Sequence, residues 1–142
     1  MKEQNIKWIF VAISIILFLS SLTQNAYLID NGKESVGSFG LIALLLGWMG
    51  VFGSAIAWLA NPCLLLSGLL LIIGKTKLSM LFSILAVGLA LSFLLVDEII
   101  ANEGGGKGKI TAYDTGYWLW SSSCLVNLLG NLVVKIREKD SL

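Results

Sequence analysis

Histidine is absent from the 142 residues, and the chain holds only one proline and two cysteines. Histidine is the usual general acid or base near neutral pH and the commonest metal ligand, so its absence removes the groups on which most such sites are built. Cys63 and Cys124 lie in apolar segments without CxxC spacing. This pattern favours two small buried apolar side chains over a disulfide or redox pair.

Charged residues are also scarce, at 13% of the chain against 56% apolar residues, with a mean hydropathy of +0.85. Soluble domains carry about 25% charged residues, so the composition predicts an integral membrane protein. A β-barrel would need apolar and polar residues in alternation. The unbroken apolar run at 41–46 lacks that alternation, and we therefore predict an all-α fold that forms a single domain over residues 1–142.

No long basic run accompanies the net charge of +1, and nucleic acid is not an expected partner. Ionisable residues occur only at predicted helix ends or in loops. This argues against a proton pump that needs a carboxylate inside the bilayer, although a channel lined by hydroxyls and amides remains open. Neither the paired cysteines of thiol oxidoreductases nor the histidine clusters of intramembrane metalloenzymes occur, so we expect no cofactor and no enzymatic activity.

Apolar segments of membrane-crossing length alternate with short polar turns along the chain. The N-terminal segment has the basic start of a secretory signal, but Gln24 stands where a cleavage site needs a small residue, so we predict an uncleaved helix. A flexible polar loop is predicted at 101–114, where glycine and charged residues are dense. The helices are predicted at about 6–28, 38–60, 62–74, 78–100 and 115–135.

The uncharged stretch 38–74 is too long for one upright crossing and short for two. Asn61-Pro62 resembles an N-cap followed by proline in the first helical turn, which makes Pro62 a candidate hinge between two parts of the stretch. Small residues recur at steps of three and four before that point and would form one helix-packing face. This candidate packing face comprises Ala43, Gly47, Gly50, Ser54, Ala57 and Asn61.

Lysine and arginine are enriched in cytoplasmic loops of membrane proteins. The turn at Lys75 and Lys77 and the basic C-terminal tail are two spans apart, and both are therefore predicted to be cytoplasmic. Charge balance favours four net crossings with both termini in the cytoplasm, over five crossings with the N-terminus outside. With four crossings, either the part of the stretch before Gly53 lies along the outer surface or the part after Asn61 lies near the inner one.

Two sets of polar residues stand out. In the last helix Ser123, Asn127 and Asn131 share one face and should point into the bundle, where amides act as interhelical bonds. Asp97, Glu98, Glu103 and Asp114 gather on the predicted outer side. Carboxylates can hold a divalent cation, but no EF-hand spacing is present, so a solvated acidic rim is favoured.

These features predict a small, non-enzymatic polytopic membrane protein. It would act by binding another membrane or secreted protein, or a second copy of itself, as accessory or immunity subunits do. The alternative function is a small oligomeric transporter or channel. The basic-inside bias and the lack of an N-x-S/T sequon favour the bacterial cytoplasmic (inner) membrane.

Overall fold

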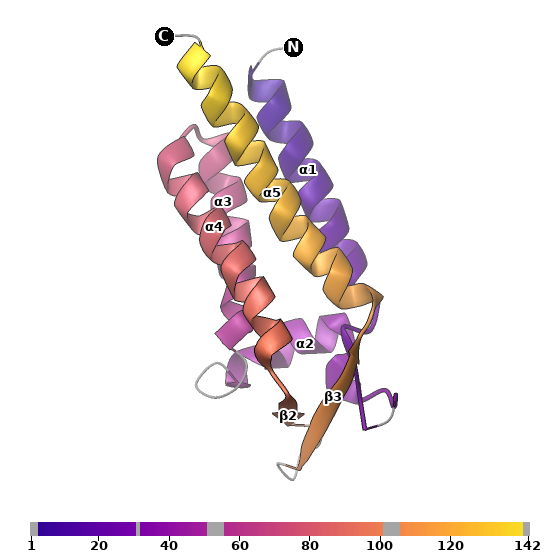
Figure 1. The fold of residues 1–142 in the computed structure, drawn as a ribbon. Helices are drawn as coiled ribbons and strands as arrows, with labels where there is room; N and C mark the ends of the chain where they lie inside the picture. The colour runs from indigo at the N-terminus through magenta and orange to yellow at the C-terminus, as the bar shows by residue number, and fades with distance from the viewer. Residues whose placement is uncertain (1–2, 31, 51–55, 101–105, 141–142) are drawn as a thin grey trace.

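Four long helices form a bundle in the computed structural model, which describes residues 3–30, 32–50, 56–100 and 106–140 (Figure 1). Helix α1 packs most extensively against α5, and α3 against α4, which also contacts α5. Both ends of the described chain lie at one end of the bundle together with the turn between α3 and α4; we call this the terminal end. The bundle helices are α1 (Glu3–Ser21), α3 (Ala60–Ile72), α4 (Thr76–Ser92) and α5 (Thr115–Asp140).

The opposite end carries a three-stranded antiparallel sheet, and we call it the sheet end (Figure 1). The strands are β1 (Tyr27–Ile29), β2 (Glu98–Ile100) and β3 (Lys107–Tyr113), in the order β1-β3-β2. The all-α prediction is therefore incomplete, and 107–113 is a strand rather than a flexible loop; residues 101–105 lie outside the described residues. Strands of three residues have no stability of their own and form here only because distant segments pair.

The predicted single helix at 38–60 is wrong. The chain forms the short helix α2 (Gly40–Leu46), the 3-10 turn η2 (Gly47–Gly50) and, after a gap in the described residues, the 3-10 turn η3 (Ile56–Leu59). Glycines at 47 and 50 weaken a helix. The indole nitrogen of Trp58 donates to the carbonyl oxygen of Leu44 at 2.8 Å, which satisfies a group that α2 leaves open at its C-terminus.

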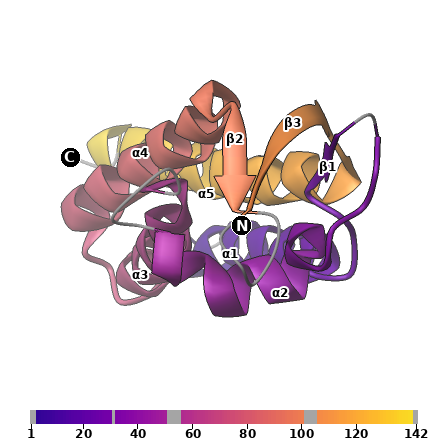
Figure 2. The same ribbon diagram turned by 90° about the horizontal axis from the view of Figure 1, so that it is seen from below.

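Helix α2 lies across the bundle at the sheet end instead of along its axis (Figures 1 and 2). Backbone bonds hold it there, because the amides of Gly40 and Leu41 donate to the carbonyl oxygens of Gln24 and Leu22. An added Cβ at Gly40 would lie 2.3 Å from the Ser21 carbonyl oxygen, so only glycine fits this crossing.

Two further helix ends differ from the sequence prediction. Helix α1 ends at Ser21 rather than near residue 28, and α4 gives way at Ser92 to the 3-10 turn η4 (Phe93–Leu95) rather than continuing to residue 100. At both ends a serine hydroxyl donates to the carbonyl oxygen three residues earlier: Ser21 to Phe18 at 2.6 Å and Ser92 to Leu89 at 2.6 Å. The same bond occurs at Ser83 and Ser123 inside α4 and α5, so it accompanies these helix ends without by itself ending a helix.

Many polar side chains lie inside the bundle beside its apolar clusters, and its outside is apolar. Its buried side chains include Ser14, Ser67, Ser79, Ser83, Ser123, Asn127 and Asn131, whereas large apolar side chains on the same helices are more than half exposed, among them Ile16, Leu69, Leu81, Ile84 and Leu129. Three helical segments of the described chain are long and apolar enough to cross a membrane, namely Gln4–Ser21, Thr76–Leu95 and Thr115–Lys139. Gly40–Gly50 and Ile56–Ile72 are shorter apolar helices.

Candidate functional site

A cavity of about 820 Å³ lies at the sheet end, and we call it the sheet-end cavity. It forms where the end of α1, the short helix α2, the turns η3 and η4 and the start of α5 converge. Its described lining residues include no charged side chain. The cavity therefore suits an apolar group and disfavours an ion or a polar metabolite.

The cavity has a buried floor and an exposed mouth. Tyr27, Ala57, Phe93 and Tyr117 line the floor, are all buried and belong to one packed cluster. Leu46, Met49, Ile100 and Val36 also line the cavity but are more than half exposed, so they mark the mouth. The mouth thus lies between α2 with its following turn on one side and β2 on the other, which Figure 2 shows on opposite sides of the sheet end.

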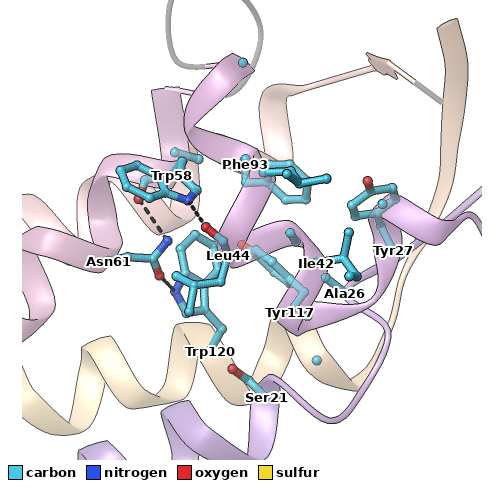
Figure 3. A pocket seen from close by; sticks show the side chains of 18 of the residues that line it. Ser21, Ala26, Tyr27, Ile42, Leu44, Trp58, Asn61, Phe93, Tyr117 and Trp120 are labelled. Atoms are coloured by element: carbon cyan, nitrogen blue, oxygen red, sulfur yellow. Dashed lines mark hydrogen bonds between the residues drawn. The ribbon is translucent and has the colours of Figure 1, made fainter. Parts of the chain in front are cut away.

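Asn61 joins the walls of the cavity (Figure 3). Its amide nitrogen donates to the Trp58 carbonyl oxygen at 2.9 Å, and its amide oxygen accepts from the indole nitrogen of Trp120 at 2.8 Å. Asn61 is therefore not the N-cap that its position before proline predicted. The helical conformation already begins in η3, Leu59 occupies the N-cap position of α3, and the Asn61 side chain is used for tertiary contacts.

Aromatic rings cluster beneath the sheet in tilted and edge-to-face contacts. Phe93 lies 5.8 Å between ring centroids from each of Tyr27, Tyr113 and Tyr117, and Tyr117 lies 6.1 Å from Trp120. The Tyr113 hydroxyl donates to the Phe93 carbonyl oxygen at 3.2 Å. Burial raises the pKa of both Tyr27 and Tyr113 above the ordinary value of 10.0, because the phenolate would lose hydration. Both phenols therefore stay neutral at physiological pH.

A column of hydroxyls and amides runs through the bundle between the cavity and the terminal end, beside the apolar clusters of the core. Ser67 and Ser79 exchange hydrogen bonds between α3 and α4, each hydroxyl donating to the other residue's carbonyl oxygen, at 2.9 and 2.7 Å. Asn127 donates to the Leu64 carbonyl oxygen at 3.3 Å, and Asn131 to the Ser67 hydroxyl at 3.4 Å. The side-chain oxygens of Asn127 and Asn131 are buried and have no partner in the described structure.

The predicted polar face of the last helix occupies this column. Ser123, Asn127 and Asn131 are each at most 1% exposed, and the Ser14 hydroxyl of α1 donates to the Ser123 carbonyl oxygen at 2.8 Å. The column ends near Thr76, whose hydroxyl donates to a Glu138 carboxylate oxygen at 2.6 Å.

The predicted acidic rim is not assembled into one site within the described part of the chain. Asp114 accepts from the Thr115 amide at 2.7 Å at the start of α5, whereas Glu98 lies 3.6 Å from the Lys107 ammonium across the sheet. Asp97 uses its carbonyl oxygen to accept from the Ile110 amide, and Glu103 lies outside the described residues. No group of three or more metal-binding side chains occurs among the residues described.

The candidate packing face is divided between separate elements. Ala43, Gly47 and Gly50 line the cavity from α2 and η2, and Ala57 and Asn61 line it from η3 and α3; Ser54 lies outside the described residues. An added Cβ at Gly47 would stand 2.6 Å from the Trp58 ring, so this glycine admits the indole rather than a second long helix. Pro62 lies in the first turn of α3, where proline costs no hydrogen bond.

Sequence reasoning missed Trp58, Trp120 and Tyr117 as cavity residues. The last two belong to an aromatic group at the start of the last helix, a pattern that equally indicates a membrane–water interface. Ser67 and Ser79 were also missed, since single serines in apolar helices have no spacing signal. Trp58 could have been found from its position three residues before Asn61, the helical spacing at which a side chain reaches back to a carbonyl oxygen.

Comparison with known proteins does not add to this picture. The chain matches no protein-family model, no curated protein and no solved structure. The sheet-end cavity and the polar column are therefore the two candidate sites from which a function can be inferred.

Proposed function

We propose that this chain is a polytopic protein of a bacterial cytoplasmic membrane. The distribution of side chains supports the proposal, because many buried side chains of the bundle are hydroxyls and amides while its outer surface carries exposed leucines and isoleucines. In water that outer surface would be costly, whereas in lipid it is the favourable arrangement, and inward amides then bind helices together.

The proposal includes four crossings, made by α1, α3, α4 and α5. Both ends of the described chain lie at the terminal end (Figure 1), which fits an even number of crossings. The weakest of the four is the Ile56–Ile72 segment. Its 3-10 turn adds to the length of α3 to give about 28 Å, close to the thickness of a bilayer core. The remaining part of the uncharged stretch is α2, which would lie along the membrane surface.

The proposed orientation puts the terminal end in the cytoplasm. Lys75, Lys77, Lys135 and Arg137 belong to that end, in the turn between α3 and α4 and in the last turns of α5. Positive side chains near span ends favour the cytoplasmic side. The sheet end would then face the outside.

In our proposal the protein is non-enzymatic and acts by binding a partner protein at the sheet end. One observation carries this: three distant chain segments combine there into a folded platform with a strand edge at β2, whereas the outer side of β1 is already bonded to Lys33 through Ile29. Strand edges accept an added strand from another chain. Beside this edge Leu95 is 84% exposed and Ile100 is 60% exposed, which gives the platform apolar contact points.

Photo-cross-linking in living cells tests the partner-binding function. A photoreactive amino acid at Leu95 or Ile100 is expected to capture one defined protein. The same group at Ile136, which is equally exposed at the terminal end, is the matched control and should not capture that protein. Capture of the same protein from all three positions, or of none, would contradict the proposal.

A second candidate function, a small oligomeric transporter or channel, draws support from the polar column. The unpartnered oxygens of Asn127 and Asn131 are acceptors that a permeating cation or water chain could use. Cation flux through the purified protein in liposomes, lost in Asn131→Leu, would favour this alternative over partner binding.

A further inference from the structure

We propose that the sheet-end cavity holds one acyl chain of a membrane phospholipid. The inference rests on the proposed membrane insertion but not on partner binding. The volume of about 820 Å³ falls within the range of about 300 to 1,000 Å³ that small-molecule pockets occupy. Its lining is apolar and uncharged, so a hydrocarbon chain is the chemistry that it matches.

Water does not suit this cavity. A buried water needs two to four polar partners, and four of the polar side chains in the walls are already engaged. Both ends of the Asn61 amide are bonded, the indole nitrogens of Trp58 and Trp120 donate to protein oxygens, and the Tyr117 hydroxyl donates to the Ala90 carbonyl oxygen at 3.2 Å. An apolar occupant therefore satisfies the site better than solvent does.

The position of the mouth indicates that the occupant comes from the bilayer. Leu46 and Met49 form one side of it, and they continue the exposed apolar surface of α2, which includes Leu41 and Leu45. With α2 on the membrane surface, this side of the mouth opens onto phospholipid chains, the most concentrated hydrocarbon available. A protein helix about 10 Å across would fit only about two turns into the same volume, too little for a partner helix to be recognised.

Photolabelling from the lipid tests the inference on the full chain. The protein would be reconstituted into vesicles of phosphatidylethanolamine and phosphatidylglycerol that contain a phosphatidylcholine with a diazirine at the end of one acyl chain. Adducts are expected on the floor residues Phe93 and Tyr117 and on the wall residue Trp120, as well as on the outward-facing Leu81. Labelling of Leu81 without labelling of the floor would overturn the inference.

Filling the cavity supplies the specific control. Ile42→Trp adds volume inside the cavity and should abolish the floor adducts while leaving those on Leu81. Leu41→Trp, one residue earlier on α2 and outside the cavity lining, should keep both. If Ile42→Trp does not fold, Ala43→Phe replaces it. Floor labelling that survives both filling variants would refute an acyl chain in the cavity.

Two further arms separate the remaining explanations. A free fatty acid with the same diazirine, added to the same vesicles, should label the floor less than the phospholipid does; stronger labelling would overturn the phospholipid as source. Resistance to alkaline extraction reports membrane insertion independently. A protein that stays inserted but has an unlabelled floor contradicts only this inference, whereas a protein released by alkali contradicts the proposed membrane location itself.

Discussion

The helices pack differently towards the two ends of the molecule. Towards the terminal end the helices are joined by small hydroxyls and amides beside one apolar cluster, and Ser67, Ser79 and Asn131 leave no exposed surface. At the sheet end large rings and aliphatic side chains meet around a cavity of about 820 Å³. Small polar residues let backbones approach closely, whereas bulky residues hold them apart. The first half brings helices close together, and the second leaves a cavity between its elements.

The close-packed half can be tested most severely at Gly130. An added Cβ there would lie 2.6 Å from Cβ of Phe10 on α1, whereas an added Cβ at Gly88 meets nothing within 4 Å. Gly130→Leu should lower the free energy of unfolding in detergent by about 3 kcal/mol through overpacking. Gly88→Leu is the matched control and should leave it unchanged or raise it by up to about 1 kcal/mol. Equal stability of the two variants would show that α1 and α5 do not pack closely.

The cavity half depends on Asn61. Asn61→Leu leaves the Trp120 indole nitrogen without its acceptor, so we expect a loss of about 1 to 3 kcal/mol in the free energy of unfolding and a shift in indole fluorescence. A double-mutant cycle with Trp120→Phe isolates the bond. Additive effects in that cycle would mean that the two side chains do not interact, and that Asn61 does not join the walls of the cavity.

The polar column should respond more weakly. Asn127→Leu removes one 3.3 Å bond to the Leu64 carbonyl oxygen but also removes an unpartnered buried oxygen. We expect thermal unfolding in detergent to show a loss of about 0.6 kcal/mol, the average for such interhelical bonds in membranes. Asn5→Leu, at an exposed asparagine of α1, is the control. Unchanged melting of Asn127→Leu would show that its amide contributes nothing to helix association.

Alkaline pH should destabilise the sheet end, and only slightly. Burial raises the folded-state pKa of Tyr27 and Tyr113 above the ordinary 10.0, so the fold favours their protonated form. Their contribution to stability is complete below about pH 10 and is lost as pH rises through the raised pKa. Melting temperature measured on both sides of pH 10 should fall less in Tyr27→Phe. A wild-type profile identical to that of Tyr27→Phe would contradict the burial of this ring.

Local chemistry explains which features could be predicted from the sequence. Segments of bilayer length are visible because each must be apolar by itself, and α4 and α5 follow from that rule. The spacing of Asn127 and Asn131 places them on one face without knowledge of any neighbour. By contrast, β1 pairs with β3, a segment more than 80 residues away, with Leu28 opposite Ala112. No local pattern in three residues predicts such a strand.

The stretch from 38 to 74 shows most clearly what could not be predicted from the sequence. Its apolar composition predicted helices but not the break into α2 and α3, because the Trp58 bond to Leu44 and the anchoring of Gly40 to the end of α1 stabilise the bent arrangement over a straight helix. The small residues that looked like one packing face are consequently divided between separate elements that line the cavity.

The sequence by itself determined that the chain is mostly helical, that its helices are long and apolar and that polar side chains recur on one face of the last helix. These are properties of single segments, which depend only on residue type and helical period. Only the tertiary structure decided that α2 lies across the bundle, that a sheet forms at one end and that a cavity opens beneath it. Each of these results from contacts between residues far apart in the chain, which no single segment contains.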